Sequence, residues 1–167
     1  MTTNDFIRQC KNSGNFTDKQ MYQIWYGFEQ GLSIKQVGLY ATPKFDYNQM
    51  EEIRWGFSDG LTVEQVKVFA KPEFNWSQMY QIRYGLEHNL SMEQVKVYAN
   101  SEFNEDQMSE IRWGFQQGLT IEQIEIYATP KFNDEQMIKI RHFIKENNDI
   151  PYNTLKFIIG LGIPNNT

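Results

Sequence analysis

The chain repeats itself every 29 residues, and this self-similarity restricts its fold more than any other feature of the sequence. Within each copy a Phe is followed by a Gln-Met pair and then by an Ile, and in the first four copies a Gly comes three residues later. A repeat of this length holds one supersecondary unit that cannot bury its apolar side chains alone, so neighbouring copies have to stack. The phenylalanines that mark the five copies are Phe16, Phe45, Phe74, Phe103 and Phe132.

The first half of each copy carries the signals of a helix, which we call helix A. In the second copy Asp46 and Gln49 have the spacing of a capping box, and Phe45 and Met50 have that of the hydrophobic staple. We expect each helix A to be about 13 residues long. It should end at a residue that tolerates left-handed backbone, and these residues are Gly31, Gly60, Asn89, Gly118 and Asn147.

A second capping box in each copy indicates that a helix B follows at once. In the second copy this box is formed by Thr62 and Gln65. The helix is expected to end near Ala70, because Pro72 blocks its continuation. The equivalent ends in the other copies are Ala41, Ala99 and Ala128. Each copy is therefore predicted to be a helical hairpin.

These patterns predict an all-α fold, a right-handed α-solenoid of five tandem two-helix repeats in one domain. The expected segments are an N-terminal capping segment 1–15, repeats 16–44, 45–73, 74–102 and 103–131, and a degenerate fifth repeat with C-terminal cap, 132–167. In the fifth copy Phe143 replaces the glycine, and one residue is inserted before Ile150. Residues 5–10 can form a short helix ahead of the first repeat, and atypical ends of this kind suit an array.

The glycine in the middle of helix A needs an explanation, because it costs about 1 kcal/mol relative to Ala in a helix interior. It occurs in four copies, at Gly27, Gly56, Gly85 and Gly114. We expect close approach of a neighbouring helix to be the reason, with room for a ligand as the alternative. Replacing Gly56 by Ala is then predicted to destabilise the fold.

Composition and motifs exclude several classes of protein. The formal net charge of −5 argues against a general nucleic-acid binder. The single cysteine, Cys10, permits no intramolecular disulfide and has no base suggested beside it. No stretch resembles a signal peptide or a membrane span, and no catalytic, metal or phosphate-binding motif is found. We therefore expect a cytoplasmic protein that is not an enzyme and uses no cofactor or metal.

Large aromatic residues recur on the side of helix A opposite the core positions Met50, Ile53 and Phe57. These candidate binding residues are Tyr22, Tyr26, Trp55, Tyr80, Tyr84 and Trp113. They can form a displayed stripe, since Tyr and Trp often anchor interfaces. They can also pack between repeats, and we favour this interpretation because helix A contacts helix A of both neighbours.

Arginines form a second register, one residue before the aromatic position. The candidate binding residues are Arg54, Arg83 and Arg112, with Arg141 in the fifth copy and Trp25 in the first. A ladder of guanidinium groups can recognise carboxylates or phosphates. We favour instead ion pairs between repeats, with Glu64, Glu93 or Glu122 as partners, and we assign Glu51, Glu52, Asp59 and Glu64 to a solvated face.

The run ATPKFDYNQMEEIRWGFSDGLTVEQVKVFAKPEFNWSQMYQIRYGL resembles short helical repeats of uncharacterised phage and mobile-element proteins of Gram-positive gut bacteria. The resemblance covers Phe16 to about Lys131 and carries no catalytic residues with it. It implies an inhibitor of a host protein, including a defence system such as CRISPR.

Three functions are compatible with these features. The first is a scaffold that binds a protein partner along the array. The second is a binder of a small anionic ligand or single-stranded nucleic acid through Arg and Trp/Tyr positions, which the net charge and the separation of about 100° between the two registers disfavour. The third is a self-assembling module that uses the apolar end 157–161.

Overall fold

The computed structural model describes residues 1–160, and within them the chain forms eleven helices and no strands. The predicted all-α fold of tandem helical hairpins is thereby confirmed. The chain divides into two compact units, residues 1–88 and 89–167. The division falls in the turn between helix A and helix B of the third repeat.

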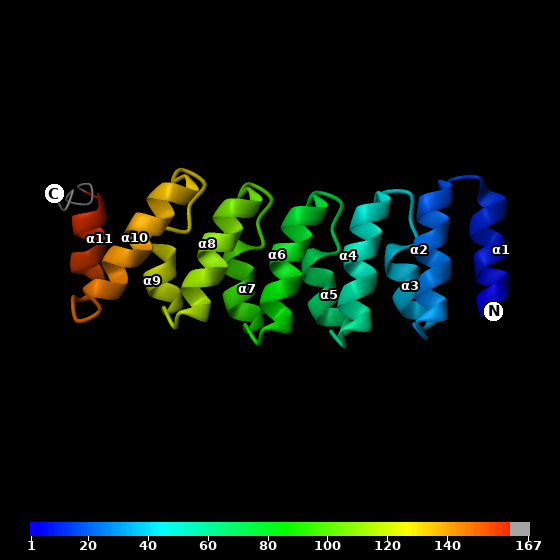
Figure 1. Ribbon diagram of the computed structural model, residues 1–167, viewed down its shortest axis with the longest axis horizontal. Coiled ribbons are helices and arrows are strands. Elements are labelled where there is room, and N and C mark those ends of the chain that lie inside the picture. Colours follow the sequence, from blue (N-terminus) through cyan, green and yellow to red (C-terminus); the bar gives the residue numbers. More distant parts are fainter. Residues whose placement is uncertain (161–167) are drawn as a thin grey trace. The chain divides into compact units, whose positions relative to one another are not determined.

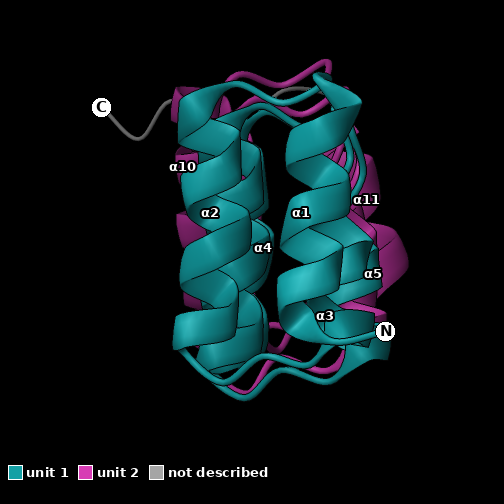
Figure 2. Ribbon diagram, turned by 90° about the vertical axis from the view of Figure 1, so that its right-hand side faces the viewer, with its two compact units in different colours: residues 1–88 teal, residues 89–167 magenta. Residues whose placement is uncertain are grey.

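Unit 1 contains α1 to α6, with the helices A in one row and the helices B in another (Figures 1 and 2). Helices A are α2, α4 and α6, which pack side by side, and helices B are α3 and α5, each held against the helices A on either side. The preceding helix α1 lies in the row of the helices B (Figure 2). The bounds are α1 Thr3–Ser13, α2 Asp18–Glu29, α3 Ile34–Tyr40, α4 Tyr47–Ser58, α5 Val63–Phe69 and α6 Trp76–Glu87.

Unit 2 contains α7 to α11 and is built from the same two kinds of helix. Helix α8 packs against α10, and α7 and α9 pack against α8. The bounds are α7 Met92–Tyr98, α8 Glu105–Gln116, α9 Ile121–Glu125, α10 Asp134–Glu146 and α11 Tyr152–Gly160. In the C-terminal apolar run, Phe157 is exposed and Ile159 is buried, while Leu161 lies outside the described residues.

The capping boxes explain why the helices begin where they do. All nine predicted boxes of the repeats are present, and α1 has another, formed by Thr2 and Asp5. The predicted ends of helix A are confirmed by positive φ angles of 83° at Gly31, 89° at Gly60, 64° at Asn89 and 88° at Gly118. The fifth helix A, α10, also ends at Asn147 as predicted, but without left-handed backbone: the φ of Asn147 is −120°, and its side-chain amide donates to the carbonyl of Phe143.

The glutamines of the helix A boxes also join one repeat to the next. While the side-chain oxygen Oε1 accepts from the backbone N–H of the cap, the amide Nε2 of Gln20 donates to the carbonyl of Phe45 at 2.7 Å, and that of Gln49 donates to the carbonyl of Phe74 at 2.6 Å. The same bond joins Gln107 to Phe132 at 2.7 Å. The sequence analysis identified only the capping role of these glutamines, so this link between repeats was missed.

The mid-helix glycines make room for an aromatic ring at the end of helix B in the same hairpin. A Cβ on Gly27 would lie 2.0 Å from the hydroxyl of Tyr40, and a Cβ on Gly56 would lie 2.8 Å from Cζ of Phe69. A Cβ on Gly114 would lie 2.1 Å from the hydroxyl of Tyr127. Close approach therefore explains the glycines, as expected, but the neighbour is a buried ring and not helix backbone.

The N-terminal segment is more regular than the sequence indicated. Helix α1 runs over Thr3–Ser13, longer than the expected 5–10, and it carries Cys10. Partial burial raises the pKa of the Cys10 thiol, which favours the less nucleophilic protonated form. Among the described helices none is long and apolar enough to cross a membrane.

Candidate functional site

Large aromatic rings are displayed on one side of α2, α4 and α6 in unit 1. Tyr22, Trp55 and Tyr80 expose 52%, 37% and 37% of their surface, and Tyr26 and Tyr84 are half-buried. The favoured interpretation, packing between repeats, is therefore wrong for the first three. We call the surface formed by Tyr22, Tyr26, Trp55, Tyr80 and Tyr84 the aromatic face. In unit 2 the equivalent Trp113 on α8 is also exposed.

Guanidinium groups lie between the rings of the aromatic face. The Cζ atom of Arg54 is 4.8 Å from the centroid of the Tyr26 ring and 5.7 Å from that of Trp55. The Cζ atom of Arg83 is 5.4 Å from the Trp55 ring and 5.5 Å from the Tyr80 ring. These distances suit cation–π attraction. A continuous run of alternating ring and cation therefore crosses three helices.

Arg54 is buried and held by side chains of the preceding helix A. Its Nε donates to Oε1 of Gln23 at 2.8 Å, and its Nη1 donates to the side-chain oxygen of Gln30. On its own helix, Glu51 lies 3.4 Å from Nη2. Only 2% of Arg54 is exposed, so its guanidinium supports Tyr26 and Trp55 from beneath and offers no free surface to a ligand.

Arg83 is held by three carboxylates. Its Nε donates to Glu52 at 2.9 Å, and its Nη1 lies 2.6 Å from Glu87 and 3.4 Å from Asp59. Burial raises the pKa of Glu52 more than Arg83 lowers it. The pKa of Glu87 is also raised, first by burial and then by the nearby Asp59. Glu52 is only 3% exposed, which corrects its assignment to a solvated face.

The arginines of unit 2 are buried too. Arg141 donates to Glu110 at 2.9 Å and to Gln117 at 2.9 Å, and Arg112 donates to Gln116 at 2.8 Å. Ion pairing between repeats is thus confirmed for Arg83 and Arg141, whereas Arg54 bonds to glutamines of the preceding repeat. The predicted partners were wrong. The partners described for Arg54, Arg83 and Arg141 lie on helices A, whereas the predicted ones, Glu64, Glu93 and Glu122, are exposed residues of helices B.

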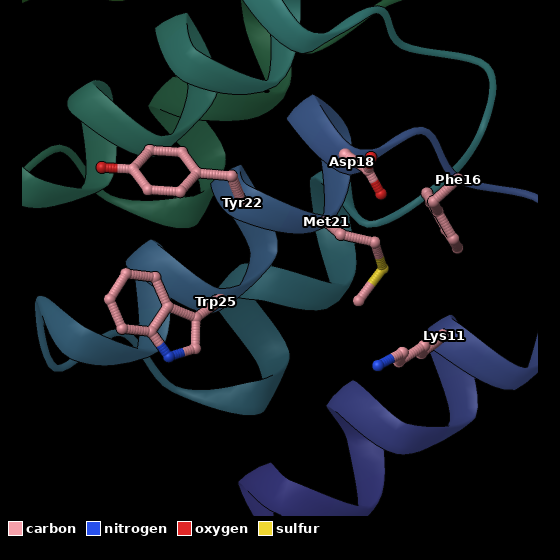
Figure 3. Close-up of a pocket in the computed structure, with 6 residues that line it drawn as sticks. All are labelled: Lys11, Phe16, Asp18, Met21, Tyr22 and Trp25. Atoms are coloured by element: carbon pink, nitrogen blue, oxygen red, sulfur yellow. The ribbon is translucent and has the colours of Figure 1, made fainter.

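Trp25 differs from the arginines whose position it shares. Its ring is 44% exposed and lies 5.9 Å from Tyr22 and 6.2 Å from Tyr26, centroid to centroid. It borders a surface hollow of about 460 Å³ between α1 and α2, which the sequence did not reveal (Figure 3). The hollow is lined by Lys11, Phe16, Asp18, Met21, Tyr22 and Trp25.

Two further aromatic residues extend the display beyond the predicted set. Trp76, the first residue of α6, is half exposed, and Tyr47, the first residue of α4, has Lys19 Nζ 4.4 Å from its ring centroid. Spacing could have revealed Trp76, because it precedes Tyr80 by four residues and so shares its side of the helix.

Comparison with known proteins found no relative of this chain. No protein-family model matches the chain, and neither a curated protein nor a solved structure is similar to it.

Proposed function

We propose that the chain is a non-enzymatic scaffold that binds a partner protein through the aromatic face. The observation that carries the proposal is the setting of Trp55, an exposed ring that lies beside the two buried guanidinium groups of Arg54 and Arg83. A side chain fixed in this way loses little conformational freedom when a partner covers it. Tyr and Trp in such positions are the usual energetic anchors of protein interfaces.

The same setting argues against nucleic acid or a small anion as the ligand. Binding through stacked rings and guanidinium groups requires cations that can reach phosphates. Arg54 and Arg83 are 2% and 7% exposed, and their donors are already used by Gln23, Glu52 and Glu87. A protein surface that covers the rings needs no free cation.

The resemblance to phage and mobile-element repeats indicates which class of partner protein to test first. It favours a host protein as the partner, with a defence system such as CRISPR among the candidates, and the cytoplasm as the place of action. Expression of the chain in a host that carries an active CRISPR system tests this directly. Survival of a targeted phage with the wild-type chain, and its loss with a Trp55→Ala variant, are the expected results.

The general proposal is tested by cross-linking and affinity capture from host lysate. Wild type is compared with Trp55→Ala, with Trp55→Ala/Trp113→Ala and with Phe157→Ala, a variant of an exposed ring on α11. Circular dichroism first establishes that all four proteins are equally helical. A protein captured by the wild type and Phe157→Ala, and lost with the Trp55 variants, supports the proposal. A partner captured equally by all four contradicts it.

A further inference from the structure

Helix α2 lacks the neighbour that α4 and α6, the other helices A of unit 1, have on the side of the chain's N-terminus. In Figure 2, which faces this end of unit 1, α1 stands in the row of α3 and α5, and α2 is uncovered. Side chains that are buried in the second repeat are accordingly open in the first. Met50 is fully buried, whereas Met21 is half-buried, and Arg54 is 2% exposed, whereas Trp25 is 44% exposed.

The backbone at this edge also has a free acceptor. The carbonyl groups of Phe45 and Phe74 each accept a bond from the glutamine amide of the preceding helix A. Phe16 holds the equivalent position in the first repeat, and no residue of the described chain donates to its carbonyl. Lys11, on the rim of the same hollow, forms no ion pair within residues 1–160.

We propose that this edge of α2 is a docking site for one amphipathic α-helix of a partner protein, seated as a preceding helix A would be. The guest helix donates a side-chain amide to the carbonyl of Phe16. It places apolar side chains against Met21 and Trp25, and it brings a carboxylate to Lys11. The site goes beyond the proposed function, because it lies at the end of the array and shares only Tyr22 with the aromatic face.

The junctions inside the chain indicate a helix as the guest. At the junctions of repeats 1 and 2 and of repeats 2 and 3, helix A supplies a Gln to a Phe carbonyl and a Gln or Glu to the Arg of the next repeat, as Gln23 does for Arg54 and Glu52 for Arg83. At the first repeat the arginine is replaced by Trp25, so the guest needs an apolar contact at that point. Lys11 then takes the place of the arginine as the cation with which a side chain of the guest helix can pair.

A second copy of this chain fits the edge poorly. Its last helix A, α10, carries Lys139 where the earlier repeats have Gln23, Glu52 and Glu110. If α10 of a second copy were seated at this edge, the helix B that follows it, α11, would fall in the row of the helices B. That place is already occupied by α1. A separate helix without a following helix B avoids both conflicts.

The test uses a helix of this chain as its probe. A fluorescent peptide of residues 104–118, held helical by a side-chain cross-link, carries Gln107 and Glu110, which face the next repeat in unit 2. Its binding to the full-length protein is followed by fluorescence anisotropy. We expect saturable binding that is weakened at least about tenfold by Met21→Asp or Trp25→Asp, or by Gln107→Leu in the peptide.

Phe157→Ala is the matched control and should bind the peptide unchanged, because this exposed ring on α11 belongs neither to the edge of α2 nor to the aromatic face. The proposal is overturned if the peptide shows no saturable binding up to about 1 mM, or if both edge variants bind it as tightly as the wild type. It is also overturned if sedimentation shows that the protein self-associates and that the peptide fails to compete. Loss of partner capture by Trp55→Ala affects only the proposed function, so the two failures are distinguishable.

Discussion

Gly27 lies against a buried ring, and replacing it with Ala tests whether packing explains the mid-helix glycines. The new Cβ would lie 2.0 Å from the hydroxyl oxygen of Tyr40, well inside van der Waals contact. Tyr40 is fully buried, and its hydroxyl donates to the carbonyl of Gln23 at 3.2 Å. The ring therefore has no free space to move into, and Gly27→Ala should destabilise the protein despite its better helix propensity.

The expected size of the effect follows from three contributions. Helix propensity favours Ala by about 1 kcal/mol. Overpacking a buried site costs about 1–3 kcal/mol, and the short contact places Gly27→Ala in the upper part of this range. Displacing the Tyr40 hydroxyl from its acceptor costs about 1 kcal/mol more. The net loss is about 2–3 kcal/mol, which corresponds to a fall of roughly 4–12 °C in Tm for a chain of this size.

A second substitution separates packing from other causes. Tyr40→Phe removes the clashing oxygen and leaves the nearest ring atom, Cζ, 3.3 Å from the new Cβ. The double variant Gly27→Ala/Tyr40→Phe should therefore recover at least about 1 kcal/mol relative to the sum of the single changes. Urea unfolding of all four proteins, followed by circular dichroism, measures this coupling. Additive effects, or a higher Tm for Gly27→Ala, would refute the packing explanation.

Three further changes test other parts of the structure. Tyr127→Phe should raise stability by about 1 kcal/mol, because the buried Tyr127 hydroxyl has no partner within residues 1–160; a lower Tm contradicts this. Glu52→Gln keeps an acceptor for Arg83 and removes the carboxylate whose pKa burial raises in the folded state. Because that raised pKa means that wild-type stability from this group is lost as pH rises, the Tm of the variant relative to the wild type should be higher at neutral pH than in acid. A relative Tm of the variant that instead rises in acid contradicts this. Gln49→Leu should lower the free energy of unfolding by about 1–2 kcal/mol, since it removes both a cap and the bond to the carbonyl of Phe74. An unchanged midpoint of urea unfolding would show that the bond between repeats does not stabilise the fold.

The features that the sequence predicted best are those that depend on neighbours in the chain. The capping box joins Asp46 and Gln49, which are three residues apart, and the left-handed turn at Gly60 depends on that residue and its immediate neighbours. Spacing in the sequence alone therefore identifies both features. At Asn147 the helix also ends where predicted, but the degenerate fifth repeat closes it with a side-chain amide bond to Phe143 and not with a left-handed residue.

The features that the sequence did not predict depend on how one repeat meets the next. The partners of Arg83 lie 31 residues away at Glu52 and 24 away at Asp59, and neither spacing equals the 29-residue period. The display of Trp55 has the same origin, because the buried arginines fill the junction and leave the adjacent ring outside. The open edge at Trp25 follows from the position of α1, which no spacing in the sequence reveals.

Binding by the aromatic face is tested most directly by titration calorimetry with the purified partner identified by cross-linking. Wild type, Trp55→Ala and Phe157→Ala are compared under one set of conditions, after melts show equal stability. Removal of an anchor ring should cost at least about 2 kcal/mol, or roughly 30-fold in Kd, so Trp55→Ala should bind that much more weakly, and Phe157→Ala should bind as the wild type does. Equal affinity of all three proteins for the partner would contradict the proposal that the aromatic face is the binding surface.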